Sequence, residues 1–361
     1  MNIKSSLLPI ALAAIVFLSA CNDEGRKASV VTPPASQAPS FKQVVAFGDS
    51  LSDAGTYNPT TADANPANDS LTGLTFSTKP GSTWVVYVAA TFGQTLTPNQ
   101  QVNFGVVGNG GKVTELGGLD YAEGGARIDI DAPNGGVVTQ NIPGVGPVPV
   151  QLASSRSIKT QIDDYLAEHG NSFNDDQLVL IQGGANDLFN FLGQVAADPS
   201  LAANAPTIVA TVTTSMLAQI GRLKSAGATH VIYANLPDLG KTPQFRTTPL
   251  AGLASQISTA YNTGVVNQLN AWGVHIFDTS SLINEVVQSP GTFGFTNATS
   301  PACNSFTTPG NPATLSALIC SPTTLVAPNA DLTYVFADGV HPTARAHATW
   351  ADRVTATFPS P

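Results

Sequence analysis

Short apolar segments alternate with longer amphipathic segments along most of the chain. Each short segment ends in a turn and is typical of a buried strand; the four are QVVAFGDS (43–50), DQLVLIQGGAND (176–187), THVIYANLPDLG (229–240) and VHIFDTSSLI (274–283). The longer segments have helical spacing and cover 82–93, 157–170, 204–226, 251–273 and 341–358. This alternation predicts an α/β protein in which helices cover both faces of a parallel sheet.

One region departs from this pattern. From 103 to 149 the chain is rich in Gly and Val and poor in charge, and we interpret it as turns, short hairpins and loop. No further linker rich in Pro and Gly follows residue 40. The sequence therefore predicts one domain over 41–361.

Polar residues stand at the ends of the predicted strands. They are Asp49–Ser50, Asn186–Asp187, Asn235 and Asp278. Ligands of open parallel sheets bind beyond the carboxyl ends of the strands, so we expect the functional site at this edge.

The first forty residues predict export and lipid attachment. Residues 1–20 hold Lys4 and the apolar run LLPIALAAIVFL, which is too short for a stable membrane span and fits a signal peptide. The run ends in LSAC and resembles a bacterial lipoprotein signal, which implies acylation of Cys21. The alternative is an ordinary signal peptide with a chance cysteine. Residues 21–40 are polar and rich in Pro and Ser, as in a flexible tether.

This N-terminus predicts a location outside the cytoplasm. We expect a lipid anchor in the bacterial cell envelope, at the outer membrane, or secretion. Membrane attachment would be through Cys21 alone, because the rest of the chain reads as a soluble domain.

Composition excludes one class of partner. The 361 residues include 42% hydrophobic and 11% charged residues, and the net charge is −9. An acidic chain without runs of Lys and Arg cannot neutralise phosphates, so we expect no nucleic-acid binding. The hydrophobic content is enough for a large core, and we expect a monomer.

The two other cysteines are predicted to form a disulfide. Cys303 and Cys320 flank a loop-like segment in a chain marked for export, where disulfides persist. Two free thiols are the alternative. A zinc site would need more ligands than this pair offers, and we predict neither a metal nor a cofactor.

Ser50 and His341 are the candidates for nucleophilic catalysis. Ser50 follows a predicted strand and is expected to open a helix, whose free N–H groups would face a developing negative charge. A serine needs a base, and His341 stands three residues after Asp338, which could fix its tautomer. The other four histidines lie at helix ends or in predicted elements, where a structural role is expected.

An acyl-transfer site also needs donors for an oxyanion. Asn186 offers a side-chain amide, AEGGA (122–126) offers a glycine N–H, and Ser50 offers its own N–H. The neighbouring carboxylates Asp49, Asp53 and Asp187 are expected to accept backbone N–H bonds and to take no part in proton transfer.

These residues stand in blocks that resemble the SGNH, or GDSL, family of serine esterases and lipases. The nucleophile block is matched by FGDSLSDAG (47–55), the G-x-N-D block by Gly184–Asp187, and the closing D-x-x-H block by Asp338–His341. The remaining block reads DYAEGGA, in which Asp120 replaces the usual Asn. The blocks occur in the order of the family and span nearly all of the predicted domain.

The resemblance implies a fold and a mechanism. It implies a flavodoxin-like three-layer α/β/α sandwich with a five-stranded parallel sheet, the remaining strand lying within 95–125. It implies Ser50, His341 and Asp338 as the triad. The oxyanion hole would be Ser50, Gly125 and Asn186, with Gly124 as the alternative to Gly125. The implied substrate is an ester or lipid.

The resemblance leaves the precise activity open. Hydrolysis of carboxylic esters is the first expectation. A phospholipase or an acyltransferase would use the same triad, and a non-catalytic surface-binding lipoprotein is a further alternative.

Overall fold

The central sheet is built from the four apolar segments that the sequence predicts as strands. The computed structural model describes residues 41–60, 74–106, 113–132, 137–142, 146–151, 154–303 and 317–358. The sheet order is β1–β7–β8–β9, with all strands parallel. Their bounds are Gln43–Phe47, Gln177–Ile181, His230–Ala234 and His275–Phe277. The predicted parallel sheet is therefore confirmed for these strands.

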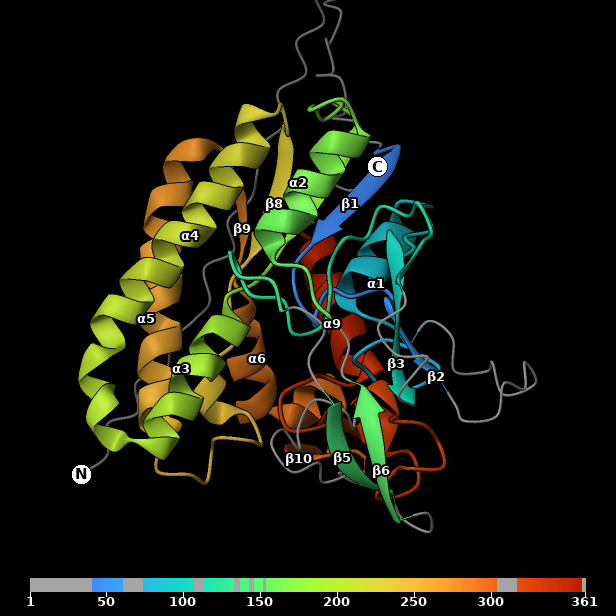
Figure 1. Ribbon diagram of the computed structural model, residues 1–361, viewed down its shortest axis with the longest axis vertical. Coiled ribbons are helices and arrows are strands. Elements are labelled where there is room, and N and C mark those ends of the chain that lie inside the picture. Colours follow the sequence, from blue (N-terminus) through green and yellow to red (C-terminus); the bar gives the residue numbers. More distant parts are fainter. Residues whose placement is uncertain are drawn as a thin grey trace, which may run out of the picture.

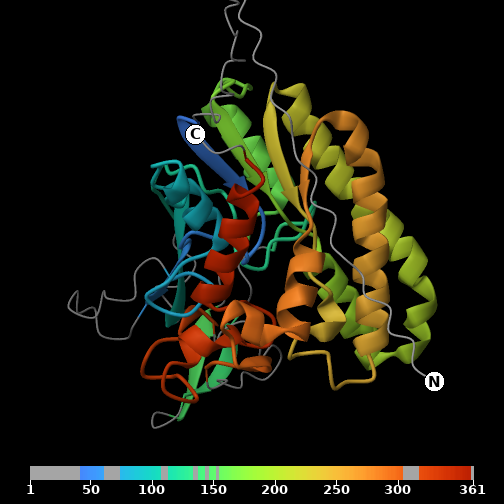
Figure 2. The same ribbon diagram turned by 180° about the vertical axis from the view of Figure 1, so that it is seen from behind.

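Helices cover both faces of this sheet, as the alternation predicts (Figures 1 and 2). One face packs against α2 (Ile158–Glu168), α3 (Ala185–Ala197), α4 (Ala205–Ser225) and α5 (Ala251–Leu269). The other packs against α1 (Trp84–Thr91), α6 (Thr279–Gln288) and α9 (Ala344–Thr355). Val45 and Phe47 of β1 point to the first face, and Val44 and Ala46 to the second, because side chains alternate along a strand. The result is a three-layer α/β/α sandwich.

At the position expected for a fifth strand, beside β1, the chain forms only one β-bridge. Asp120 pairs in parallel with Ala46 of β1, through hydrogen bonds from Ala46 N–H to Leu119 and from Tyr121 N–H to Ala46. The expected strand between 95 and 125 is thus placed correctly beside β1, but it is shorter than a regular strand. The chain turns away because Asp120 directs its carboxylate to the N–H groups of Ala54 and Ala122.

A second sheet lies beyond one end of the sandwich (Figure 1). Its strand order is β2–β3–β6–β5, and β4 pairs with β3. These strands span Tyr57–Thr60, Gln100–Val106, Gly146–Gln151, Val137–Ile142 and Val113–Glu115 in that order. The β5–β6 hairpin and the β3–β4 pair agree with the hairpins predicted for this Gly- and Val-rich region.

Shorter elements complete the described chain. They are the 3₁₀ helices η2 (Pro199–Asn204), η3 (Leu239–Lys241), η4 (Asn270–Trp272) and η5 (Pro290–Phe293), the helix α8 (Ala330–Thr333), and the paired strands β10 (Asn297–Pro301) and β11 (Tyr334–Phe336). Asp338 lies in the loop directly after β11. The loop after η3 lies next to the loop that contains Asp338.

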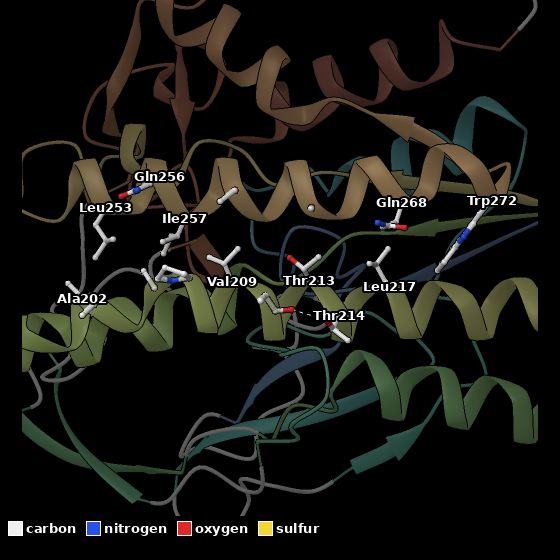
Figure 3. A pocket seen from close by; sticks show the side chains of 16 residues that line it. Ala202, Val209, Thr213, Thr214, Leu217, Leu253, Gln256, Ile257, Gln268 and Trp272 are labelled. Atoms are coloured by element: carbon white, nitrogen blue, oxygen red, sulfur yellow. Dashed lines mark hydrogen bonds between the residues drawn. The ribbon is translucent and has the colours of Figure 1, made fainter.

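A groove of about 900 Å³ runs between α4 and α5 (Figure 3). Small and apolar side chains line it, among them Val209, Leu217, Leu253 and Ile257, and Trp272 stands at one end. None of the predicted site residues lines this groove, so the groove is separate from the chemistry.

Candidate active site

The structure brings Ser50, His341 and Asp338 together although Ser50 and His341 are 291 positions apart. Ser50 Oγ lies 2.8 Å from His341 Nε2, and His341 Nδ1 lies 2.8 Å from Asp338 Oδ2. The three side chains are nearly buried, with exposed fractions of 8%, 2% and 1% for Ser50, His341 and Asp338. This is the arrangement in which an imidazole takes a serine proton while a carboxylate fixes its tautomer.

Ser50 lies in a tight turn directly after β1, and no helix starts at this serine. The Asp49 carboxylate accepts the Leu51 N–H and the Asp49 carbonyl accepts the Ser52 N–H, and these two bonds close the turn. The Ser50 N–H donates to no group in the described chain and remains free for an oxyanion. The expected role of this N–H therefore survives without the helix.

The side chain of Gln161 in α2 fixes the turn through two hydrogen bonds to Gly48. Its amide accepts the Gly48 N–H and donates to the Gly48 carbonyl, both at 2.9 Å. Gly48 has φ +153°, and a Cβ there would lie 2.4 Å from the Gln182 carbonyl. Only glycine fits this close approach to β7, so the turn that presents Ser50 depends on it.

Asp338 is held by three backbone N–H groups besides the His341 imidazole. Its Oδ1 accepts from Val340 and His341, at 2.9 and 2.8 Å, and its Oδ2 accepts from Ala317 at 3.1 Å.

The Cys303–Cys320 disulfide is formed, with Cα atoms 5.6 Å apart. It joins the two segments that flank Asp338, because Cys303 N–H donates to Ala337 and Ala317 precedes Cys320 by three residues.

Asn186 lies in the first turn of α3, beside the cleft that contains Ser50 and His341. Its Nδ2 donates to the Ala126 carbonyl at 2.9 Å, which leaves the second N–H of the amide for an oxyanion. The same bond ties the Gly125–Ala126 segment to α3.

The backbone distinguishes the two candidate glycines. Gly124 donates its N–H to Asp53 Oδ2 at 3.0 Å, and a Cβ on Gly124 would lie 2.1 Å from Phe76. Gly125 has φ +81° and open space around it, and its N–H meets no acceptor in the described residues. The N–H of Gly124 is therefore occupied and the residue is tightly packed. The N–H of Gly125 has no acceptor among the described residues and can bind an oxyanion.

Asp187 connects α3 to the loop that carries Gly125. Its oxygens accept from Arg127 Nε and from the Ile128 N–H, each at 3.0 Å. Burial raises the pKa of Asp187, and the bonds from Ile128 and Arg127 partly oppose this. The predicted backbone-binding roles of Asp49, Asp53 and Asp187 are confirmed by these bonds and by the two that Asp53 accepts from Gly55 and Thr56.

Three more carboxyl groups lie buried beneath this loop. Burial raises the pKa of Asp53 to about 6 and of Glu123 to about 7, and it places that of Asp120 well above its ordinary range. Arg156 pairs with Glu123 at 2.7 Å and also bonds to Asp164 at 2.8 Å. Asp120 stands where the family usually has Asn. Its two oxygens accept the backbone N–H groups of Ala54 and Ala122, so Asp120 joins the segment after Ser50 to the segment before Gly125.

Asp49 is the titratable group nearest to the nucleophile in sequence. Burial raises its pKa to about 7, while the Leu51 N–H and the charge of His341 lower it. Its Oδ2 has no partner among the described groups.

Phe76 and Arg127 are contacts that the sequence analysis did not assign. Phe76 lies against the His341 ring, with ring centroids 5.0 Å apart, and closes one side of the imidazole. Arg127 directly follows the AEGGA block in the sequence, and this proximity to the glycines could have identified it as a residue of the site.

No group of three potential metal ligands is found in the residues that the structure covers. The predicted signal peptide and tether, with Cys21, lie outside the described residues.

Residues 44–354 match the GDSL-like lipase/acylhydrolase family. The match covers the triad, the oxyanion residues and both faces of the sandwich. The chain belongs to this family. The blocks at 47–55, 184–187 and 338–341 lie within the matched residues, and in this structure they converge at one edge of the sheet.

Curated relatives of this chain include proteins with functional names. Esterase EstA of Pseudomonas aeruginosa is 25% identical over 311 residues, which is 81% of this chain and 42% of the relative. A phosphatidylcholine-sterol acyltransferase of Aeromonas hydrophila is 29% identical over 136 residues, 37% of each protein. The chain thus spans less than half the length of either relative. Among solved structures, a phospholipase A1 of Streptomyces albidoflavus aligns with 88% of this chain and 100% of its own, at 11% identity and a TM-score of 0.43.

Proposed function

We propose that the protein hydrolyses carboxylic esters through an acyl-enzyme formed on Ser50. The observation that carries the proposal is the unbroken hydrogen-bond chain from Ser50 through His341 to Asp338. The esterase name of the P. aeruginosa relative supports the same reaction class.

The geometry implies the following steps. His341 Nε2 takes the proton as Ser50 Oγ bonds to the ester carbonyl carbon. The oxyanion is bound by the N–H groups of Ser50 and Gly125 and by the Asn186 amide. His341 then returns the proton to the departing alcohol, and water repeats the sequence to release the acid. One oxyanion donor typically contributes about 3–4 kcal/mol to the transition state.

The proposal is tested with p-nitrophenyl esters from acetyl to palmitoyl. We expect the wild type to hydrolyse at least one ester, and Ser50→Ala to lower kcat by about 10³-fold or more with the fold intact. Circular dichroism of both proteins serves as the control. Unchanged turnover in Ser50→Ala would reject the nucleophile.

Acyl transfer to an alcohol is the second candidate. The acyltransferase name of the A. hydrophila relative favours it. Product analysis with and without an added sterol or simple alcohol separates the two reactions. A new ester that forms at the expense of free acid would indicate transfer.

Lipid attachment at Cys21 is the remaining part of the proposal. The LSAC sequence and the polar segment after it support export and anchoring to the cell envelope. Cys21→Ser should move the protein from the membrane fraction to the soluble fraction. Continued sedimentation with membranes would reject the anchor.

A further inference from the structure

The cleft beside Ser50 is small and mostly apolar. Its free volume is about 20 Å³, little more than the ~10–15 Å³ that a single water needs by the same measure. Besides Asp49, Asn186, Thr242 and the catalytic pair, its lining is apolar and consists of Leu51, Ala185, Phe189, Pro237, Leu239 and Val340. Such a slot has room for an apolar group of about one or two carbon atoms attached to the serine, and a longer chain would have to displace its walls.

Phe189 is the largest of these apolar side chains. It stands three residues after Asn186 on α3, so both project from the same side of the helix. The buried Phe245 stacks on it at a centroid distance of 5.7 Å, with an angle of 17° between the rings. Phe189 therefore has a fixed ring behind it and cannot easily swing away from the cleft.

The loop that carries Phe245 is itself attached to the triad. Thr242 and Leu239 line the cleft, and the Gln244 N–H donates to the Gly339 carbonyl at 2.9 Å, within the Asp338–His341 loop. This hydrogen bond fixes the distance between the wall that contains Leu239 and Thr242 and the loop that contains His341. A cleft whose walls cannot move apart selects acyl groups by their size.

We propose that Phe189 limits the length of the acyl group, so that the enzyme prefers esters of short-chain acids. This inference rests on the proposed ester hydrolysis. The acyl group occupies the slot because it stays on Ser50 through both half-reactions, whereas the alcohol must leave to solvent after the first.

The test compares acyl chain length with alcohol size. The first series is p-nitrophenyl esters from acetyl to decanoyl, and the second is butyrate esters of alcohols of increasing size. For the wild type we expect kcat/KM to peak between acetyl and butyryl and to fall with longer chains. Phe189→Ala should raise the octanoyl-to-acetyl ratio of kcat/KM by about tenfold or more, since each accommodated methylene is worth about 10–200-fold.

Phe92→Ala is the matched control, because Phe92 is also half-buried in an aromatic cluster but lies on the α1 side, away from the cleft. Its chain-length profile should equal that of the wild type. Phe189→Leu, a milder change, should give an intermediate ratio and serves if Phe189→Ala does not fold.

Each contrary outcome has a distinct meaning. A wild type that prefers decanoyl esters, or a Phe189 variant with an unchanged profile, would overturn the inference while Ser50-dependent activity upheld the proposed function. A Phe189 effect confined to the alcohol series would overturn it as well. Absence of Ser50-dependent activity on every ester would overturn both.

Discussion

Single residues set the chemistry of the site, and Asp338 shows how. Its carboxylate accepts N–H bonds from Ala317, Val340 and His341 in addition to the imidazole. Asp338 Oδ2 is an acceptor beside Nδ1, which holds the imidazole proton on Nδ1, so that Nε2 faces Ser50 as an acceptor. The role of Asp338 is therefore to select a tautomer.

Asp338→Asn should lower kcat by about 10⁴-fold with little change in folding. The amide cannot stabilise the imidazolium, and its NH₂ group would favour the wrong tautomer. The measurement is kcat on a short-chain p-nitrophenyl ester. Asp352→Asn, an exposed change on α9, is the control. An Asp338→Asn enzyme with more than a tenth of the wild-type kcat would contradict the assignment.

Asp49 should make stability depend on pH. Burial raises its pKa to about 7, so between about pH 4 and 7 the folded protein holds a proton that the unfolded chain has lost. Stability is therefore lost as pH rises through this range. His347 opposes this only below about pH 6.5, because burial lowers its pKa to about 3.

The measurement is the free energy of unfolding in urea at pH 6.5 and pH 8. The wild type should be less stable at pH 8, and Asp49→Asn should reduce the difference. It should not abolish it, because Glu123 titrates in the same range. An identical pH dependence in both proteins would refute the role of Asp49.

At the scale of elements, α3 and the Gly125 loop act as one unit. Asn186 and Asp187, both in the first turn of α3, bind Ala126, Arg127 and Ile128 of that loop. The two oxyanion donors on these elements are thus positioned relative to each other in part by Asp187, whose side chain is not assigned to the oxyanion hole. Asp187 is a positioning residue in this sense.

Asp187→Ala should lower kcat by about 10²-fold and change KM little, because a displaced donor weakens transition-state binding more than ground-state binding. Asp187→Asn, which keeps one acceptor for the Ile128 N–H, should recover part of the activity. Equal kcat values for the alanine and asparagine variants would argue against positioning.

The sequence predicts most elements but omits α3. Its apolar stripe of Leu188, Phe191, Leu192 and Val195 has helical spacing, so the signal was present. The omission matters because α3 supplies Asn186 and Phe189. The helix expected at Ser50 is absent, and the chain forms a hydrogen-bonded turn there instead.

At the scale of the whole molecule, the disulfide joins distant parts of the site. The bond closes a separation of 17 residues, for which loop entropy predicts about 3 kcal/mol of stabilisation. It also holds Ala317 against Asp338.

Reduction should therefore lower both Tm and kcat. The measurement is thermal unfolding and ester hydrolysis with and without reductant, in a Cys21→Ser background that leaves only the bonded pair. Cys303→Ser with Cys320→Ser should match the reduced protein. Two free thiols in the untreated protein, or an unchanged Tm, would count against the bond in solution.

The sequence by itself determined the central strands, most helices and the identity of the triad. Strand and helix periodicity are local, and Ser50, Asp338 and His341 stand in short blocks whose residue types suit acyl transfer. These features need no knowledge of which segments meet.

Tertiary structure alone decided the fine geometry of the site. The bond from Gly124 to Asp53 occupies the Gly124 N–H, and this distinguishes Gly124 from Gly125 as an oxyanion donor. The turn at Ser50 depends on the hydrogen bonds of Gln161. Phe189 narrows the cleft, and Phe245 packs behind it. These contacts join residues dozens to more than a hundred positions apart. Local pattern carries no information about such pairs, because their distances are fixed only when the sheet and its helices pack together.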